Sequence, residues 1–154
     1  MKQSLAALGA LFFCVTGSSG AEVPAAAPGP LVAQLFIATT SASLPLGKVV
    51  LKVNGLSREK GSYVGDYQVN VSPLFVANEK GRICIKVSED SLRRLAAGNP
   101  VDFTGQAVTS GSGKTRPIDG TAIPSATDRG AVKLSFNADN RRLTFNTTYR
   151  FADR

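Results

Sequence analysis

The chain has 154 residues, 43% of them apolar, and carries 18 Lys and Arg against 11 Asp and Glu, for a net charge of +7. This length and apolar content suffice for one globular domain with its own hydrophobic core. His is absent, which excludes Ser-His-Asp and Cys-His nucleophilic catalysis and most zinc or copper sites.

The N-terminal residues predict an export signal. Lys2 is followed by the apolar run Leu5 to Val15 and then by small polar residues up to Gly20, which are the parts of a secretory signal peptide. We therefore expect residues 1–21 to be removed and the protein to be periplasmic or extracellular. The apolar run is too short to remain as a membrane span, so we expect no transmembrane helix in the mature chain.

Cleavage at this position would leave a basic chain with one thiol. Loss of Lys2 reduces Lys and Arg from 18 to 17 against 11 acidic residues, so the net charge falls from +7 to +6. Cys14 would also leave, and Cys84 could then form no intrachain disulfide. Residues 22–30 are rich in Pro and Ala and predict a flexible tether, which leaves residues 31–154 as a single β domain.

The first half of this domain alternates short apolar runs with turn signals. We predict strands at residues 31–38, 48–53, 62–71 and 82–87. Asn54-Gly55 favours a two-residue hairpin turn, because both residues tolerate positive φ. Residues 56–61 are polar and charged and predict a loop, and residues 78–81 predict a further turn.

One short α-helix is expected at about residues 88–97. Ser88 can cap it, and Glu89 and Asp90 complement the positive N-terminus of a helix. Gly98 is placed to end it. A helix of this length is not stable alone, so we expect it to close one end of the β structure or to cover a sheet edge.

The strongest strand signal lies near the C-terminus. After a strand at 101–108, a flexible loop and a weak strand at 118–123, residues 131–151 alternate apolar and polar side chains in two runs, which predicts a β-hairpin with one buried face. The whole pattern predicts a mainly β fold, either an antiparallel β-sandwich or a small β-barrel of about seven or eight strands with one short α-helix.

The sequence contains no recognisable catalytic motif. Residues 112–115 (SGKT) resemble the end of a phosphate-binding loop, but Val108 stands where its first glycine is required and Pro117 interrupts the helix that should follow. The carboxylates are scattered through turns and the helix start. We therefore predict a protein that is not an enzyme and has no cofactor and no metal, with a carboxylate-dependent hydrolase as an alternative.

A candidate binding surface lies on the polar side of the predicted C-terminal hairpin. Lys133, Arg142 and Arg150 share this side and are the candidate ligand-binding residues. Such a stripe would favour a polyanion, namely an acidic glycan, lipopolysaccharide or an anionic lipid surface. The plainer interpretation is a charged face that contacts only water. Most aromatic residues fall on the apolar face, which disfavours nucleic acid as the partner.

We thus expect an exported binding or envelope-associated protein for an anionic ligand. The alternative is a small outer-membrane β-barrel, because alternating aromatics such as Tyr149 and Phe151 are typical of the closing strand of those proteins. Residues 152–154 follow the last aromatic, and most other predicted strands are too short to cross a bilayer, which weighs against this alternative.

Overall fold

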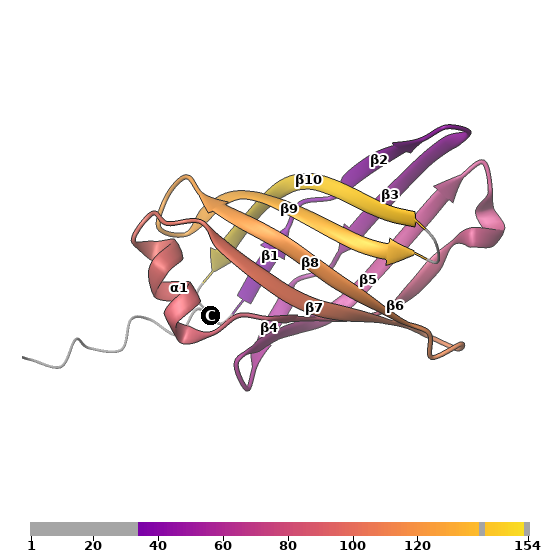
Figure 1. Ribbon diagram of the computed structural model, residues 1–154. Coiled ribbons are helices and arrows are strands. Elements are labelled where there is room, and N and C mark those ends of the chain that lie inside the picture. The colour runs from indigo at the N-terminus through magenta and orange to yellow at the C-terminus, as the bar shows by residue number, and fades with distance from the viewer. Residues whose placement is uncertain (1–33, 139–140, 153–154) are drawn as a thin grey trace, which may run out of the picture.

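The computed structural model describes residues 34–138 and 141–152, so the expected signal peptide and tether lie outside the described part of the chain (Figure 1). In chain order the elements are β1 (Gln34–Ile37), β2 (Thr40–Leu44), β3 (Gly47–Val53), β4 (Leu56–Glu59), β5 (Ser62–Ser72), the 3₁₀ turn η1 (Phe75–Ala77), β6 (Glu79–Lys86), α1 (Glu89–Ala96), β7 (Val101–Thr109), β8 (Thr115–Pro124), β9 (Arg129–Ala138) and β10 (Arg141–Ala152).

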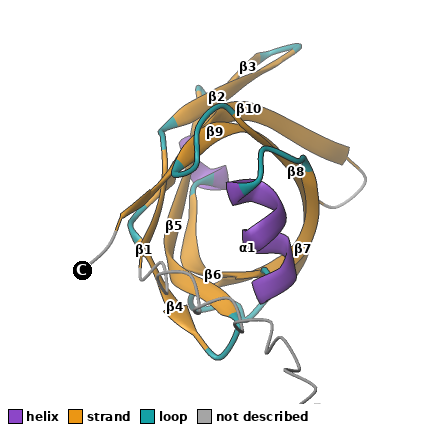
Figure 2. Ribbon diagram, turned by 90° about the vertical axis from the view of Figure 1, so that its left-hand side faces the viewer, coloured by secondary structure: helices purple, strands orange, loops and turns teal. Residues whose placement is uncertain are grey.

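The strands form a closed antiparallel β-barrel. Eight of them follow one another around it in the order β5, β4, β1, β10, β9, β8, β7, β6, and β6 pairs again with β5. β3 and β2 extend the sheet from β5. Of the two architectures that the sequence predicts, the structure has the barrel, with its short helix at one end (Figure 2).

β3 and β4 are two parts of one bent strand that runs beside β5. Val53 pairs with Tyr67 and Ser57 pairs with Val64, so one strand advances by four residues where the other advances by three. Asn54-Gly55 therefore forms a β-bulge, which bends the strand without reversing it.

The hairpin turn predicted at Asn54-Gly55 and the loop predicted at 56–61 are therefore wrong. The chain reverses at Lys60 and Gly61, where φ is +45° and +81°, as the two central residues of a hairpin turn require. Gly55 instead serves close packing, because a Cβ atom there would lie 3.0 Å from the ring of Phe36.

The inward-facing side chains fill the barrel with an apolar core. The predicted C-terminal hairpin is confirmed as β9 and β10, with Phe145 opposite Leu134 and both buried. Phe136 packs edge-on against Phe145 at 5.9 Å between ring centroids. Gly105 faces inward where β6 and β7 approach closely, because a Cβ atom there would lie 2.3 Å from the carbonyl oxygen of Cys84.

The predicted helix is present and lies across one end of the barrel (Figure 2). The Ser91 N–H donates to Ser88 Oγ at 3.1 Å, which caps the helix, and Gly98 follows it with a φ of +86°. Leu95 is buried in the core, and Arg58 pairs with Glu89 at 2.6 Å, which attaches α1 to β4. We call this end, with α1, the turn at 60–61 and the loop at 125–128, the helix end.

Candidate functional site

The opposite end of the barrel contains a cavity of about 340 Å³. This open end comprises the turn at 45–46, the connection at 73–78 and the loop at 110–114. The walls of the cavity are mainly apolar and include Leu44, Val49, Val69, Val71 and Leu143, and its lining also includes Tyr67, Phe136 and Phe145. The cavity is therefore a pocket at the barrel mouth whose lining reaches the packed core.

Towards this end β2 diverges from β10 (Figure 1). β1 pairs with β10 up to Ile37 and Tyr149. Near the bend, the Ala38 N–H donates to the Thr148 carbonyl at 3.0 Å and the Thr40 hydroxyl donates to the Asn146 carbonyl at 2.9 Å. Beyond these contacts β2 pairs with β3. Leu44 on β2 and Leu143 on β10 both line the cavity, so the cavity includes the space between these strands.

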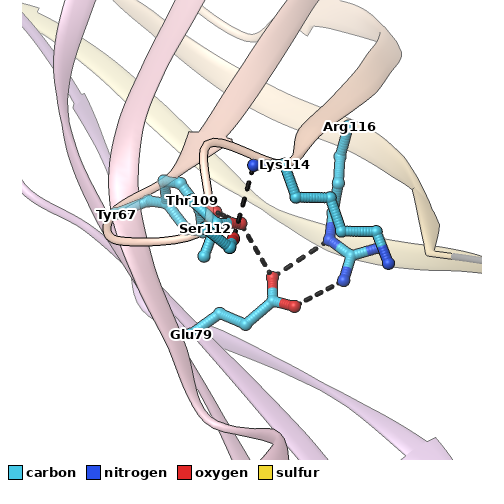
Figure 3. A network of polar contacts seen from close by, with 6 residues as sticks. All are labelled: Tyr67, Glu79, Thr109, Ser112, Lys114 and Arg116. Atoms are coloured by element: carbon cyan, nitrogen blue, oxygen red, sulfur yellow. Dashed lines mark hydrogen bonds and ion pairs between the residues drawn. The ribbon is translucent and has the colours of Figure 1, made fainter.

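A carboxylate–guanidinium pair lies in the wall of this cavity (Figure 3). Arg116 Nε donates to Glu79 Oε2 at 3.0 Å, and Arg116 Nη2 donates to the other carboxylate oxygen. Arg116 is 8% exposed. The Thr109 hydroxyl donates to Glu79 at 3.4 Å and lies 3.2 Å from the Tyr67 hydroxyl, so the pair belongs to a larger polar network.

The electrostatics of the cavity favour an anion. The hydrogen bond from Arg116 holds the pKa of the Glu79 carboxyl below its ordinary value, and the nearby charge of Lys114 acts in the same direction. Arg141 also lines the cavity. Three cations, Arg116, Lys114 and Arg141, thus lie in or beside the cavity. Among the described residues that line it, Glu79 carries the one carboxylate, and this carboxylate is charged.

The sequence pattern alone did not indicate this site. Glu79 falls in the turn predicted at 78–81, which is wrong because β6 already begins at Glu79. Glu79 lies on the same inward face of β6 as Gly81 and Ile83, and Arg116 lies on the same inward face of β8 as Ile118. Extension of the period-two alternation by two pairs before Ile83 and by one pair before Ile118 would have placed both charges inside the barrel.

The residues that the sequence singled out lie elsewhere, on the outer face of β9 and β10. Arg142 forms an ion pair with Asp119, and the Arg150 guanidinium lies 5.4 Å from the centre of the Phe36 ring. Lys133 is exposed opposite Asn146. The three share one face, but eight residues of strand separate the two arginines, or about 26 Å. Their binding role stays a prediction.

No three His, Cys, Asp or Glu side chains of residues 34–138 and 141–152 gather closely enough to hold a metal ion. Within the same ranges, no helix is long and apolar enough to cross a membrane. Comparison of the chain with models of protein families, with curated proteins and with solved structures finds no match.

Proposed function

We propose that this protein is an exported, non-enzymatic barrel that binds a small amphiphile with an anionic group in the open-end cavity. The observation that carries this proposal is the combination, in one cavity, of apolar walls with the anchored Arg116 and with Arg141. A volume of about 340 Å³ lies within the range of small-molecule sites, which are mostly apolar with a few placed polar groups.

The two kinds of lining would have different tasks. The apolar part of a ligand would be stabilised by its removal from water against Val69, Val71 and Leu143. Its anionic group would be attracted to Arg141, which is exposed at the start of β10. Glu79 holds Arg116 in a fixed position, so little conformational entropy would be lost when a ligand meets that guanidinium.

The same features weigh against the other two interpretations. Carboxylate-dependent hydrolysis needs two carboxylates across one cleft. Among the described residues that line the cavity, Glu79 is the one with a carboxylate. A membrane barrel presents an apolar band outward. Here the outward positions of β5 and β6 carry Asp66, Gln68 and Arg82, which supports a barrel whose outer face contacts water.

Dye titration tests the proposal. We expect an anionic anilinonaphthalene sulfonate and a neutral phenylnaphthylamine both to bind and to fluoresce more strongly. Arg141→Gln should weaken the anionic dye about fivefold, or about 1 kcal/mol, and leave the neutral dye unchanged. Arg93→Gln, at an exposed position on α1 at the helix end, is the matched control and should affect neither. Failure of both dyes to bind, or equal effects of the two substitutions, would contradict a charged cavity site.

The outer stripe of Lys133, Arg142 and Arg150 is a second candidate site, since all three side chains face outward from one hairpin. We expect weak heparin binding that falls steeply with added salt, because it would depend on counterion release. Simultaneous replacement of the three by Gln should abolish that binding and leave the melting temperature nearly unchanged. If wild type does not bind heparin, or if the triple variant binds as well, the stripe is only a solvated face.

A further inference from the structure

Three large apolar side chains are exposed on neighbouring connections at the open end. Leu46 is 86% exposed, Leu74 is 59% exposed and Val76 is 96% exposed. The two connections leave adjacent strands, because Lys48 near the start of β3 pairs with Ser72 at the end of β5. Figure 1 shows the tip of the β2–β3 hairpin and η1 at the same end of the barrel, away from α1. Exposed apolar groups that gather in this way are typical of an interaction surface.

Basic side chains surround this apolar patch. Lys48 and Lys80 are exposed near the starts of β3 and β6, and Arg141 begins β10. Of the acidic side chains towards this end, Glu79 and Asp119 each pair with an arginine, and Asp66 is exposed on β5 opposite Arg82. The helix end carries charges of both signs among the described residues, with acidic side chains at Glu59, Glu89, Asp90, Asp102 and Asp128 and basic side chains at Arg58, Lys60, Lys86, Arg93, Arg94 and Arg129.

We propose that the open end docks on an anionic lipid bilayer. The apolar tips Leu46, Leu74 and Val76 would enter the interfacial region to a depth of about 5–10 Å, which is typical of interfacial elements. Lys48 and Lys80 would contact the anionic headgroups, with their alkyl chains along the apolar boundary. Charge complementarity and the apolar tips favour a lipid surface. Leu74 and Val76 also line the cavity, but docking requires no ligand in it, so the inference goes beyond the proposed function.

The chain contains no Trp, so single Trp substitutions can report insertion site by site. Leu46→Trp and Val76→Trp place the probe on the patch, and Ile123→Trp places it at an exposed apolar position on β8 towards the helix end. With vesicles of phosphatidylcholine and about one-third phosphatidylglycerol, we expect a blue shift and quenching by brominated lipid for the two patch variants and neither for Ile123→Trp. No shift at the patch, or an equal shift at Ile123→Trp, would overturn the proposal.

Vesicle co-sedimentation tests the energetics. Leu46→Ser/Leu74→Ser/Val76→Ser should reduce binding at least about tenfold, whereas Ile123→Ser should bind as wild type does. Lys48→Gln/Lys80→Gln should reduce binding about 25-fold at low salt, or about fivefold per charge, with Lys60→Gln/Lys86→Gln as the control at the helix end. Wild type should bind phosphatidylcholine alone far more weakly.

A melting curve for each variant separates loss of docking from loss of fold. If the triple Ser variant unfolds, the Lys48→Gln/Lys80→Gln variant tests docking in its place, because both lysines lie at exposed positions. Failure of wild type to sediment with the anionic vesicles, full binding by the patch and Lys variants, or equal losses in the helix-end controls would each overturn the docking surface. A protein that binds vesicles and neither dye would refute the proposed function and leave this inference standing.

Discussion

Replacement of Phe145 by alanine is expected to lower the free energy of unfolding by about 3–5 kcal/mol, which would remove much of the roughly 5–15 kcal/mol available to a domain of this size. Phe145 is 1% exposed, lies opposite Leu134 and packs edge-on against Phe136. Its removal would leave a cavity where β9 and β10 meet the core. Thermal and denaturant unfolding measure the loss.

Phe36→Ala is the matched control for this substitution. Phe36 is only partly buried and lies over Gly55 on the outer side of the barrel, so its truncation should cost much less, about 1 kcal/mol. A Phe145→Ala variant that melts within a degree or two of wild type, or a Phe36→Ala variant that is equally destabilised, would contradict the assignment of Phe145 to the core.

The parts of the fold that were predictable are those in which local chemistry and tertiary packing agree. The alternation along residues 131–151 predicted β9 and β10, because a period of two leaves no other way to bury Leu134 and Phe145 together. The cap at Ser88 and the stop at Gly98 predicted α1 to within about a residue. The choice between sandwich and barrel depended on the pairing of β1 with β10, and such long-range pairing leaves no local signal.

Asn54-Gly55 shows how tertiary context overrides a strong local preference. The dipeptide tolerates a hairpin turn, but the strand continues into Leu56, which is fully buried. Burial of Leu56 and the packing of Phe36 over Gly55 favour the bulge, and the turn moves to Lys60-Gly61. The candidate site was missed for a related reason, since charged residues at the ends of apolar runs are ordinarily assigned to loops.

Replacement of Arg116 by methionine is the second substitution for which we expect a large effect. It would leave the partly buried Glu79 carboxylate without the guanidinium that donates two hydrogen bonds to it. The free energy of unfolding should fall by about 2–3 kcal/mol at pH 7. This is somewhat less than the cost of breaking a fully buried ion pair, because the cavity is open to solvent. The double variant Glu79→Gln/Arg116→Met should be more stable than Arg116→Met alone, since it removes the stranded charge.

The effect of Arg116→Met should also depend on pH in a defined direction. Because Arg116 lowers the pKa of Glu79 in the folded protein from its ordinary 4.5, the unfolded chain binds more protons near that pH. The stabilisation from the pair is therefore fully present above about pH 4.5 and is lost as the pH falls through the lowered pKa of the folded state. Denaturant unfolding between pH 7 and about pH 3 should show the difference between wild type and Arg116→Met shrinking in acid. A difference that stays constant over this range would show that Arg116 contributes through packing and not through its pairing with Glu79.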